Sequence, residues 1–381
     1  MRKKILTLIF ALALLPRATL YAADNAALTD IRAELEKIRA AHKLPALAAA
    51  VIVDGKLAAC DAVGVRKMGD ATAVTSADQF HLGSCTKAFT GMLAAMFVQA
   101  GKLKWDSTLA GVFPELADNM HPSMQAVTLE QLLAHRSGLA ADTQGASTPF
   151  QLEKDADKLA LTLPGKRLKL LALLTHEKPA GVPGTAFVYA NCNFTLAAAM
   201  LERASGDAWE HLVSTRIFQP LEMTSAGFGP MGLPGRIEQP WQHFFKDGKA
   251  VPLNPLPSSD NPPIMNPAGR IHCSLEDWAK FVLEILRAEK GRSKLIDAQT
   301  FKRMFAPIEK GSYACGWNLA QRGWSKATVL NHNGTNTQNY AVAWLAPAEG
   351  FAVLVATNQG GGTSDKACDE VAAAMIKKFL K

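Results

Sequence analysis

The stretch that most constrains this chain is FHLGSCTK at residues 80–87, which an alanine-rich apolar run, AFTGMLAAMFV, follows at 88–98. The run contains no proline, so it predicts a helix that begins near Gly83 and Ser84. Residues three apart on a helix lie on one face, which places Lys87 beside Ser84. A lysine amine that is kept neutral can take the proton of a serine hydroxyl. The N–H groups at the start of the helix could stabilise an oxyanion. Taken alone, the pair also fits an N-cap serine followed by a surface lysine.

A second motif, Tyr189-Ala190-Asn191, follows a Pro-Gly turn and precedes an alanine-rich helical pattern at 194–204. Tyr189 could shuttle a proton if a nearby lysine lowers its pKa. Asn191 could hold the carbonyl group of a substrate amide. The alternative is a turn tyrosine with an asparagine cap.

A third motif, His332-Asn333-Gly334-Thr335, lies at the start of a late series of strands. A glycine at a strand edge lets another backbone approach closely. An acyl group lying against this strand could reach the Thr335 N–H, and the Ser84 N–H would complete a two-donor oxyanion hole. The alternative is a plain turn before a strand.

Composition limits the classes of partner. The chain has 381 residues, of which 48% are hydrophobic and 20% charged, as in a large globular protein. Four of its 41 basic residues lie in the first 23 positions, which hold no acidic residue, so 37 bases face 34 acids in the remainder. This near balance does not favour a nucleic-acid partner.

The first 23 residues are typical of a secretory signal peptide. Three basic residues at 2–4 precede a twelve-residue apolar segment, Ile5 to Pro16, which is too short to span a bilayer comfortably. Small residues at Ala22 and Ala23 indicate the cleavage site. We therefore expect an exported, periplasmic protein; the alternative is an N-terminal membrane anchor.

The cysteines favour neither a metal site nor a defined disulfide framework. No Cys-x-x-Cys and no His-Glu-x-x-His occurs, and the spacing selects none of the fifteen pairings that six cysteines allow. We expect buried free thiols, no metal and no cofactor. The cysteines are Cys60, Cys85, Cys192, Cys273, Cys315 and Cys368.

The pattern of strands predicts an α/β (α+β) fold. Two early strands at 45–53 and 56–64 flank an Asp-Gly turn, and later strands are expected at 313–319, 328–331, 340–345 and 351–357, before a closing helix at 365–380. The middle of the chain is mainly helical, with a capped helix at 128–139 that ends at a glycine, helical segments at 151–177 broken at Pro164-Gly165, and a long loop at 227–267. One antiparallel sheet is thus built from both termini. The expected divisions are 24–105 with 265–381 for the α/β region and 106–264 for the helical region.

In this order and at roughly these separations, Ser-x-x-Lys, Tyr-x-Asn and His-x-Gly resemble motifs of the class C β-lactamase and serine DD-peptidase superfamily, which also includes esterases and D-amino-acid peptidases. LLAHRSGL at 132–139 looks like the family's Leu-Leu-x-His-x-Ser-Gly-Leu segment, and PLEMTS at 220–225 resembles Pro-Leu-Gly-Met-x-x-Thr. Pro267-Ala268-Gly269, the helix after Ser274 and YACGW at 313–317 follow in family order. The resemblance covers nearly the whole chain after the signal.

The resemblance implies a β-lactamase/transpeptidase-like fold with the active site at the junction of its two regions. Ser84 would be the acylated nucleophile, with Lys87 and Tyr189 sharing the base and acid roles. Asn191, Gly334 and Thr335 would position the substrate and its oxyanion. His332 replaces the lysine of typical class C β-lactamases, and Asn333 stands where threonine is frequent.

The expected function is an exported serine hydrolase acting on an ester or amide through a Ser84 acyl-enzyme, of the esterase or D-amino-acid/DD-peptidase type. One alternative is a class C-like β-lactamase, and another is a non-catalytic penicillin- or peptidoglycan-binding protein. The expected partner is a small-molecule or peptide substrate, with a peptidoglycan-derived ligand as one candidate. The absence of a Gly-x-Ser-x-Gly motif argues against an α/β-hydrolase.

The histidine at 332 predicts a preference between substrates. A histidine that titrates near ~6.5 is mostly neutral at pH 7 to 8, so it would not attract the carboxylate of a penicillin as lysine does. We expect weak β-lactam turnover, and activity on carboxylate-bearing substrates that rises relative to neutral esters as the pH falls toward 6. His332→Lys should raise the same ratio.

Overall fold

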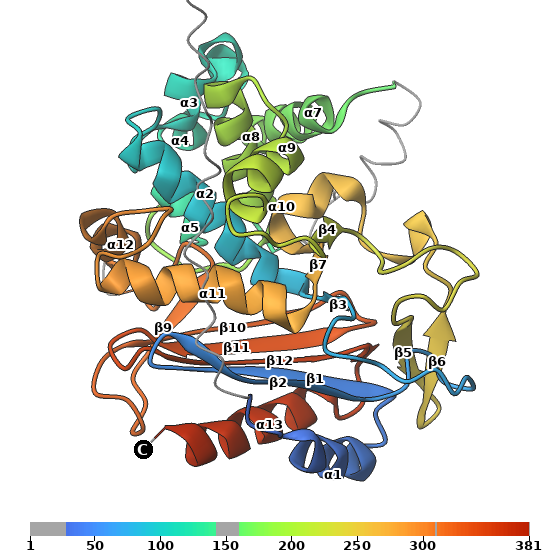
Figure 1. The fold of residues 1–381 in the computed structure, drawn as a ribbon. Helices are drawn as coiled ribbons and strands as arrows, with labels where there is room; N and C mark the ends of the chain where they lie inside the picture. The colour runs from blue at the N-terminus through green and yellow to red at the C-terminus, as the bar shows by residue number, and fades with distance from the viewer. Residues whose placement is uncertain (1–27, 142–159, 309–310, 381) are drawn as a thin grey trace, which may run out of the picture.

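The computed structural model describes residues 28–141, 160–308 and 311–380. The predicted signal peptide at 1–23 and the first part of the predicted helical segment at 151–177 lie outside the described residues. Helices cover both faces of a central sheet, and a larger helical layer stands on one of these faces (Figure 1). Both ends of the described chain lie on the opposite face.

The central sheet joins strands from both ends of the chain. In the described residues it has seven strands, all paired antiparallel, with the early hairpin β1–β2 against the late strand β12. This arrangement confirms the predicted sheet. In sheet order the strands are β2 (Lys56–Gly64), β1 (Ala46–Val53), β12 (Phe351–Thr357), β11 (Tyr340–Ala346), β10 (Val329–Thr335), β9 (Trp317–Ala320) and β8 (Tyr313–Ala314).

Strand β1 shows why the sheet is covered on both faces. Its side chains alternate between two separate cores, as the two-residue repeat of a strand requires. Ala48 and Ala50 belong to the core beneath α2 (Lys87–Gln99) and α11 (Leu275–Glu289). Leu47 and Val51 belong to the core beneath α1 (Arg32–His42) and α13 (Ser364–Phe379). A strand buried on both faces has no polar side to present, which explains its continuous apolar sequence.

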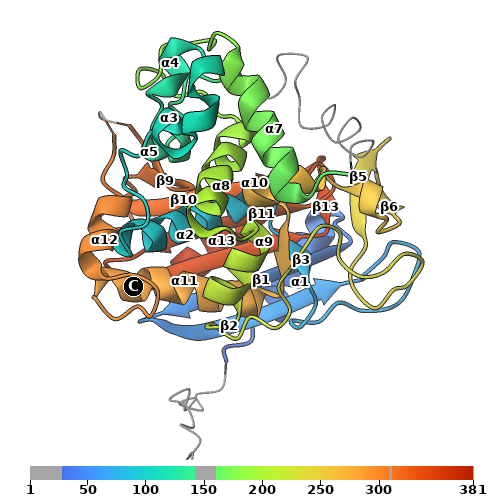
Figure 2. The same cartoon turned by 90° about the horizontal axis from the view of Figure 1, so that it is seen from above.

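The helical layer is built around α8, whose alanine-rich sequence is almost entirely buried. Seen from above, α7, α8 and α9 lie over the sheet, with α3, α4 and α5 beside them (Figure 2). The layer places the start of α8 next to α2 and α10, which is where the candidate site forms. Its helices are α3 (Leu109–Val112), α4 (Pro122–Gln125), α5 (Leu129–Leu133), α7 (Leu163–His176), α8 (Asn191–Ser205) and α9 (Trp209–Val213), and nearby are α10 (Asn266–Gly269) and α12 (Ala298–Met304).

The segment 227–267, predicted to be a long loop, contains a β-hairpin, so that prediction was wrong. Strands β5 (Gln242–Lys246) and β6 (Lys249–Leu253) pair antiparallel. Asp247 and Gly248 form the turn between them, with φ of 50° and 76°. An Asp-Gly pair between two strands is a hairpin signal, but the prolines around it obscured the pattern. The described residues also contain four short strands: β3 (Phe80–His81), β4 (Gly227–Phe228), β7 (Ile271–Cys273) and β13 (Gln359–Gly360).

Two predicted helix boundaries also differ. The helix capped by Thr128 ends at Leu133 rather than at a glycine, because His135 already has a left-handed φ of 56°. Pro164 does not break a helix but lies in the first turn of α7, where its missing N–H would be unpaired in any case. The predicted cap at Ser274 is present, since its side chain accepts the Asp277 N–H.

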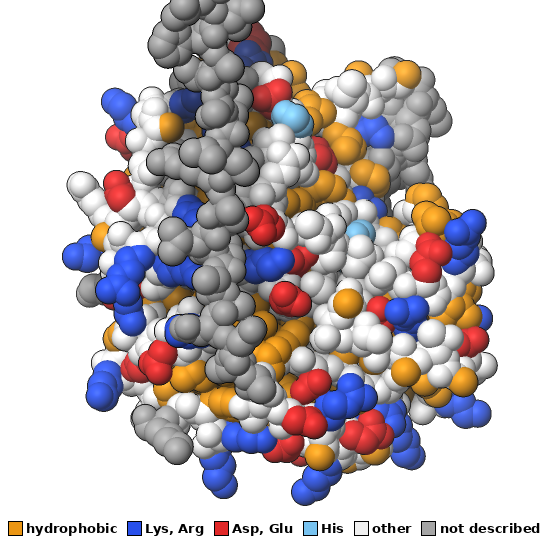
Figure 3. All heavy atoms as spheres, viewed as in Figure 1, with side chains coloured by type: hydrophobic (Ala, Val, Ile, Leu, Met, Phe, Trp, Pro, Cys, Tyr) orange, Lys and Arg blue, Asp and Glu red, His pale blue; other side chains and the backbone are white. Residues whose placement is uncertain are grey.

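The surface carries both signs of charge. Lysine and arginine alternate with aspartate and glutamate over the face shown in Figure 3, as the near balance of charges predicts. All six cysteines are buried, and none of them forms a disulfide bond. In the described ranges no helix is both long and apolar enough to cross a membrane.

Buried histidines should make the protein less stable in mild acid, and His243 offers a clear test. Burial lowers the pKa of His243 to about 4, and its Nε2 accepts the Met68 N–H at 3.0 Å. Between pH 6.5 and 4 the unfolded state therefore binds more protons, so stability falls as the pH falls. For His243 alone we expect a loss on the order of 2 kcal/mol between pH 7.5 and 5, measured by urea unfolding.

His243→Gln keeps an acceptor for the Met68 N–H but cannot titrate, so the variant should lose less stability over the same pH interval. His211→Gln, at an exposed position of α9, should leave the interval unchanged. Equal losses in wild type and His243→Gln would contradict the prediction.

Candidate active site

Ser84 and Lys87 lie together at the start of α2. Ser84 is in a 3₁₀ turn, Gly83–Thr86, that leads directly into the helix, and Lys87 is the first residue of the helix. The Nζ atom of Lys87 lies 3.1 Å from Ser84 Oγ. The side chain of Lys87 is fully buried, so its amine is fixed by protein atoms rather than by bulk water.

Two further acceptors hold the Lys87 amine. Nζ donates to Asn191 Oδ1 at 2.6 Å and to the Ala268 carbonyl oxygen at 2.7 Å. Asn191 begins α8 and Ala268 belongs to α10, so elements from three parts of the chain meet at one amine. The carbonyl oxygen of the Asn191 side chain thus faces Lys87, and its predicted role in holding a substrate amide stays a prediction.

The ring of Tyr189 faces the same amine. Lys87 Nζ lies 4.8 Å from the ring centroid, within the range of a cation–π contact. Tyr189 is 37% exposed, so it lies between the buried amine and the solvent. Ser84, Lys87, Tyr189 and Asn191 are thus adjacent in space, although their catalytic roles stay predictions.

Strand β10 passes very close to the turn that carries Ser84. A Cβ atom built on Gly334 would lie 2.1 Å from the Leu82 oxygen and 2.6 Å from the Ser84 nitrogen. A Cβ atom on Gly83 would lie 2.4 Å from the Thr335 nitrogen. The backbone of β10 can approach the Ser84 turn this closely only because both Gly83 and Gly334 lack a side chain. The Ser84 and Thr335 amides lie next to these two glycines. The two amides of the predicted oxyanion hole thus belong to backbone segments in close contact, and their role stays a prediction.

The side chain of His332 was predicted to face the carboxylate of a substrate, and the structure differs from this prediction. Its side chain is buried, with Nε2 2.9 Å from the Tyr313 hydroxyl. Burial and the charge of Lys87 lower the pKa of His332 to about 3. His332 therefore stays neutral at pH 6, so the expected rise of activity on carboxylate-bearing substrates toward that pH loses its physical basis. The neighbouring Asn333 is exposed and donates from Nδ2 to the Tyr340 hydroxyl at 3.1 Å.

Sequence reasoning did not assign His135 or Tyr313 to the site. The ring of His135 lies 4.4 Å from that of Tyr189 and 4.8 Å from that of Tyr313, measured between centroids. Burial, together with the charge of Lys87, holds the pKa of His135 well below its usual value. Burial likewise raises the pKa of Tyr313. Both residues lie in segments that resemble the family, and this was the available signal.

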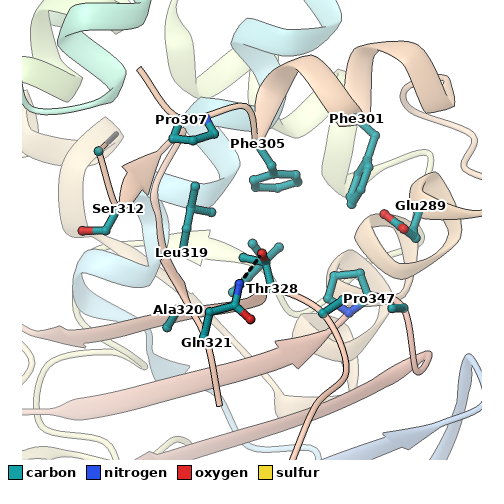
Figure 4. Close-up of a pocket in the computed structure, with 14 residues that line it drawn as sticks. Glu289, Phe301, Phe305, Pro307, Ser312, Leu319, Ala320, Gln321, Thr328 and Pro347 are labelled. Carbon is teal, nitrogen blue, oxygen red and sulfur yellow. Dashed lines mark hydrogen bonds between the residues drawn. The ribbon is translucent and has the colours of Figure 1, made fainter. Parts of the chain in front are cut away.

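A separate hollow of about 450 Å³ lies at the edge of the sheet, away from Ser84. Figure 4 shows Phe301 and Phe305 from the region of α12 above Leu319 of β9. Among its polar members, Gln321 Nε2 donates a hydrogen bond to Thr328 Oγ1 at 3.0 Å. None of the predicted site residues lines this hollow. No group of metal-ligating side chains is found within the described ranges.

Comparisons with known proteins agree with the family resemblance of the sequence motifs. The sequence profile of the family described as Beta-lactamase matches residues 31–375. Penicillin-binding protein 4 of Amycolatopsis lactamdurans is 27% identical over 342 residues, which cover 86% of this chain and 84% of that protein. A protein named Beta-lactamase from Escherichia coli K12 is 28% identical over 214 residues, which cover 56% of this chain and 51% of that protein.

Two solved structures illustrate the fold. The octameric penicillin-binding protein homologue from Pyrococcus abyssi is 21% identical, with a TM-score of 0.71, over 92% of this chain and 79% of that chain. A D-stereospecific amidohydrolase from Streptomyces sp. is 20% identical, with a TM-score of 0.69, over 90% of this chain and 98% of that chain. At these identities the likeness shows the fold, and it confirms the predicted β-lactamase/transpeptidase-like architecture. The predicted boundaries at 105 and 265 stay a prediction.

The contact between β10 and the Ser84 turn predicts the effect of adding one methyl group. Gly334→Ala should push the strand away from the Ser84 amide, because its Cβ would meet backbone atoms that cannot rotate aside. We expect an acylation rate at least ten-fold lower, with the folded state retained by circular dichroism. Gly323→Ala is the matched control, since a Cβ there meets no atom within 4 Å. Unchanged acylation in Gly334→Ala would show that this contact does not shape the reacting site.

Proposed function

This chain belongs to the Beta-lactamase family, and on that basis we propose that it is an exported serine hydrolase. It forms an acyl-enzyme on Ser84 with an ester or amide substrate, as an esterase or a D-amino-acid peptidase does. The observation that carries the proposal is the 3.1 Å contact between Ser84 Oγ and the buried amine of Lys87. Export rests on the pattern of residues 1–23.

The contacts of Lys87 explain how the amine could act as a base. Asn191 Oδ1 and the Ala268 carbonyl oxygen can only accept, so a neutral amine would spend its two N–H groups on them. Its lone pair would then point to the third neighbour, the hydroxyl of Ser84. Proton transfer to Nζ leaves the serine oxygen free to attack a carbonyl carbon.

The remaining steps use groups that are already in place. The Ser84 and Thr335 N–H groups would stabilise the oxyanion formed by attack. Tyr189, beside the amine and partly exposed, would pass the proton to the leaving group. Water would then hydrolyse the acyl-enzyme and restore the Ser84 hydroxyl.

The surroundings of Tyr189 support a substrate with an apolar group. Phe187 and Val182, on the same loop before α8, are 49% and 68% exposed. The Phe187 ring lies 5.6 Å from the rings of both His135 and Tyr313, so it belongs to the aromatic cluster beside Lys87. An exposed aromatic ring in this cluster favours contact with an apolar acyl or leaving group.

A class C-like β-lactamase is the second candidate, because one relative carries the name Beta-lactamase. The neutral, buried His332 argues against it, since this position offers no cation to the carboxylate of a penicillin. A non-catalytic penicillin- or peptidoglycan-binding protein is the remaining alternative.

Covalent labelling tests the proposal directly. A fluorophosphonate or an activated ester should add one acyl or phosphonyl group to Ser84, read by intact mass and peptide mapping. Ser84→Ala should lose the label and several orders of magnitude in turnover. Lys87→Arg should be nearly inactive, because guanidinium does not release its proton.

Ser76→Ala, at an exposed serine before β3, is the control and should behave as wild type. Binding of penicillin without acylation would support the non-catalytic alternative. A label on another serine, with Ser84 unmodified, would refute the proposal.

The state of His332 predicts how substrate preference depends on pH. Because its pKa is about 3, His332 stays neutral from pH 8 to 6. The ratio of kcat/KM for p-nitrophenyl glutarate, which carries a carboxylate, to that for p-nitrophenyl butyrate should therefore stay constant over this range. Titration of the nucleophile and its base affects both esters equally and cancels in the ratio.

A several-fold rise of the ratio in wild type at pH 6 would mean that a titrating cation faces the substrate carboxylate.

A further inference from the structure

A buried histidine–aspartate pair lies directly behind the Ser84 turn. His81 ends β3, three residues before Ser84, and Asp260 follows a 3₁₀ turn at 257–259. His81 Nε2 lies 3.0 Å from Asp260 Oδ2, and both side chains have no exposed surface. The two residues are 179 positions apart, so folding alone brings them together.

The other ring nitrogen of His81 fixes the tautomer. The Gly83 N–H donates to His81 Nδ1 at 3.1 Å, so Nδ1 must present a lone pair. The ring proton is then on Nε2, where it points to Asp260. Both nitrogens are occupied, so His81 cannot serve as the base for Ser84. It instead holds the amide of Gly83, whose φ of 51° is left-handed.

Asp260 also binds the two other backbone segments that surround Ser84. Arg270 Nε donates to Oδ2 at 3.2 Å, and Arg270 lies two residues after Ala268, whose carbonyl oxygen receives Lys87. Asn336 Nδ2 donates to Oδ1 at 2.8 Å, and Asn336 directly follows Thr335. One carboxylate thus connects three segments: the turn before Ser84, the loop formed by α10 and Arg270 that holds the Lys87 amine, and the end of β10.

A pair of this kind contributes little to stability. A buried carboxylate costs desolvation energy, and apolar side chains of similar volume often stabilise a fold as well. What apolar side chains could not do is direct the Gly83 N–H or tie three backbone segments to a common point. The consequence of the pair is therefore expected in the geometry of the site.

We propose that His81 and Asp260 are positioning residues that fix the backbone donors of the oxyanion hole and the loop that holds Lys87. The inference rests on the proposed Ser84 chemistry for its kinetic readout. His81 acts through its Nδ1 acceptor on Gly83, and Asp260 acts by orienting His81 and by binding Arg270 and Asn336.

Two substitutions of His81 separate its two nitrogens. His81→Asn places an oxygen near the position of Nδ1, so it can still accept the Gly83 N–H. His81→Gln can reach Asp260 but offers no acceptor to Gly83. We expect His81→Gln to lower kcat roughly ten- to a hundred-fold with KM within about two-fold, because misplacing a donor costs less than its loss. His81→Asn should recover most of the lost kcat.

The matched control is a second histidine–carboxylate pair on the far side of the sheet. His42 Nε2 lies 2.9 Å from Glu370 Oε2, between α1 and α13. His42→Gln should leave kcat and KM unchanged. All assays are run well below the Tm of each variant, so that unfolding does not contribute.

Asp260→Asn tests whether the two residues act together. Its loss of kcat and that of His81→Gln should not add in the double variant, because both act on the same amide. Additive losses would mean that the residues act separately and would overturn the pairing.

An independent readout does not need turnover. Nitrogen-15 NMR of labelled histidine should show His81 with a proton on Nε2 and none on Nδ1, the signal being assigned by its loss in His81→Gln. Hydrogen exchange of the peptide containing Gly83 should speed up in His81→Gln but not in His81→Asn. The opposite tautomer, or wild-type kcat in His81→Gln, would overturn the inference. Failure of wild type to acylate Ser84 would refute the proposed function alone, because the tautomer and exchange results would still stand or fall by themselves.

Discussion

The amine of Lys87 has lost its contact with water, and the rest of the site is arranged to compensate for that loss. A buried amine is costly unless each of its N–H groups finds an acceptor. Asn191 Oδ1 and the Ala268 carbonyl oxygen supply acceptors from two elements distant in sequence, and Ser84 Oγ lies 3.1 Å away on the preceding turn. The aromatic faces of Tyr189 and Phe194, 4.8 and 5.6 Å away, add a favourable field. Ser84 and Lys87 therefore have all of these neighbours only when the sheet, the helical layer and α10 are packed together.

Close contact between backbones is the second condition, and glycine provides it on both sides of α2. At its start, Gly334 brings β10 against the Ser84 amide. Over the first turn and a half of α2, a Cβ atom on Gly316 would lie 2.4 Å from the Lys87 carbonyl carbon, and one on Gly91 would lie 2.2 Å from the Cys315 oxygen. The same edge of the sheet thus contacts the helix at two levels. This explains how Ser84, the proposed nucleophile, can lie at the start of a core helix and still be close to the backbone of β10.

Local patterns were sufficient to predict what depends on short spacings. The early hairpin followed from apolar strands around Asp54-Gly55, and the proximity of Ser84 to Lys87 followed from their separation by three residues. Properties that depend on distant residues could not be predicted. The sequence position of His332 indicated a histidine of ordinary pKa that faces the substrate carboxylate. Tertiary packing instead buries the ring against Tyr313, and burial lowers the pKa of His332 to about 3. His81 and Asp260 carry no local signal of pairing at all. The hairpin at β5–β6 is different, because its Asp-Gly turn was visible and was outweighed by neighbouring prolines.

The polar contacts behind Ser84 extend beyond Asp260 into the helical layer. Arg270 donates to Asn266 Oδ1 at 2.6 Å, and Asn266 Nδ2 donates to Glu210 of α9 at 2.7 Å. Glu210 in turn pairs with the buried Arg167 of α7. Each member satisfies the next, so none can shift without leaving a buried polar group unpaired. Apolar packing tolerates small displacements because it is not directional, whereas a hydrogen bond weakens steeply when its angle changes. The chain of contacts therefore couples the orientation of α7 and α9 to the turn that carries Ser84. It holds the backbone fixed at the point where the proposed chemistry needs fixed positions.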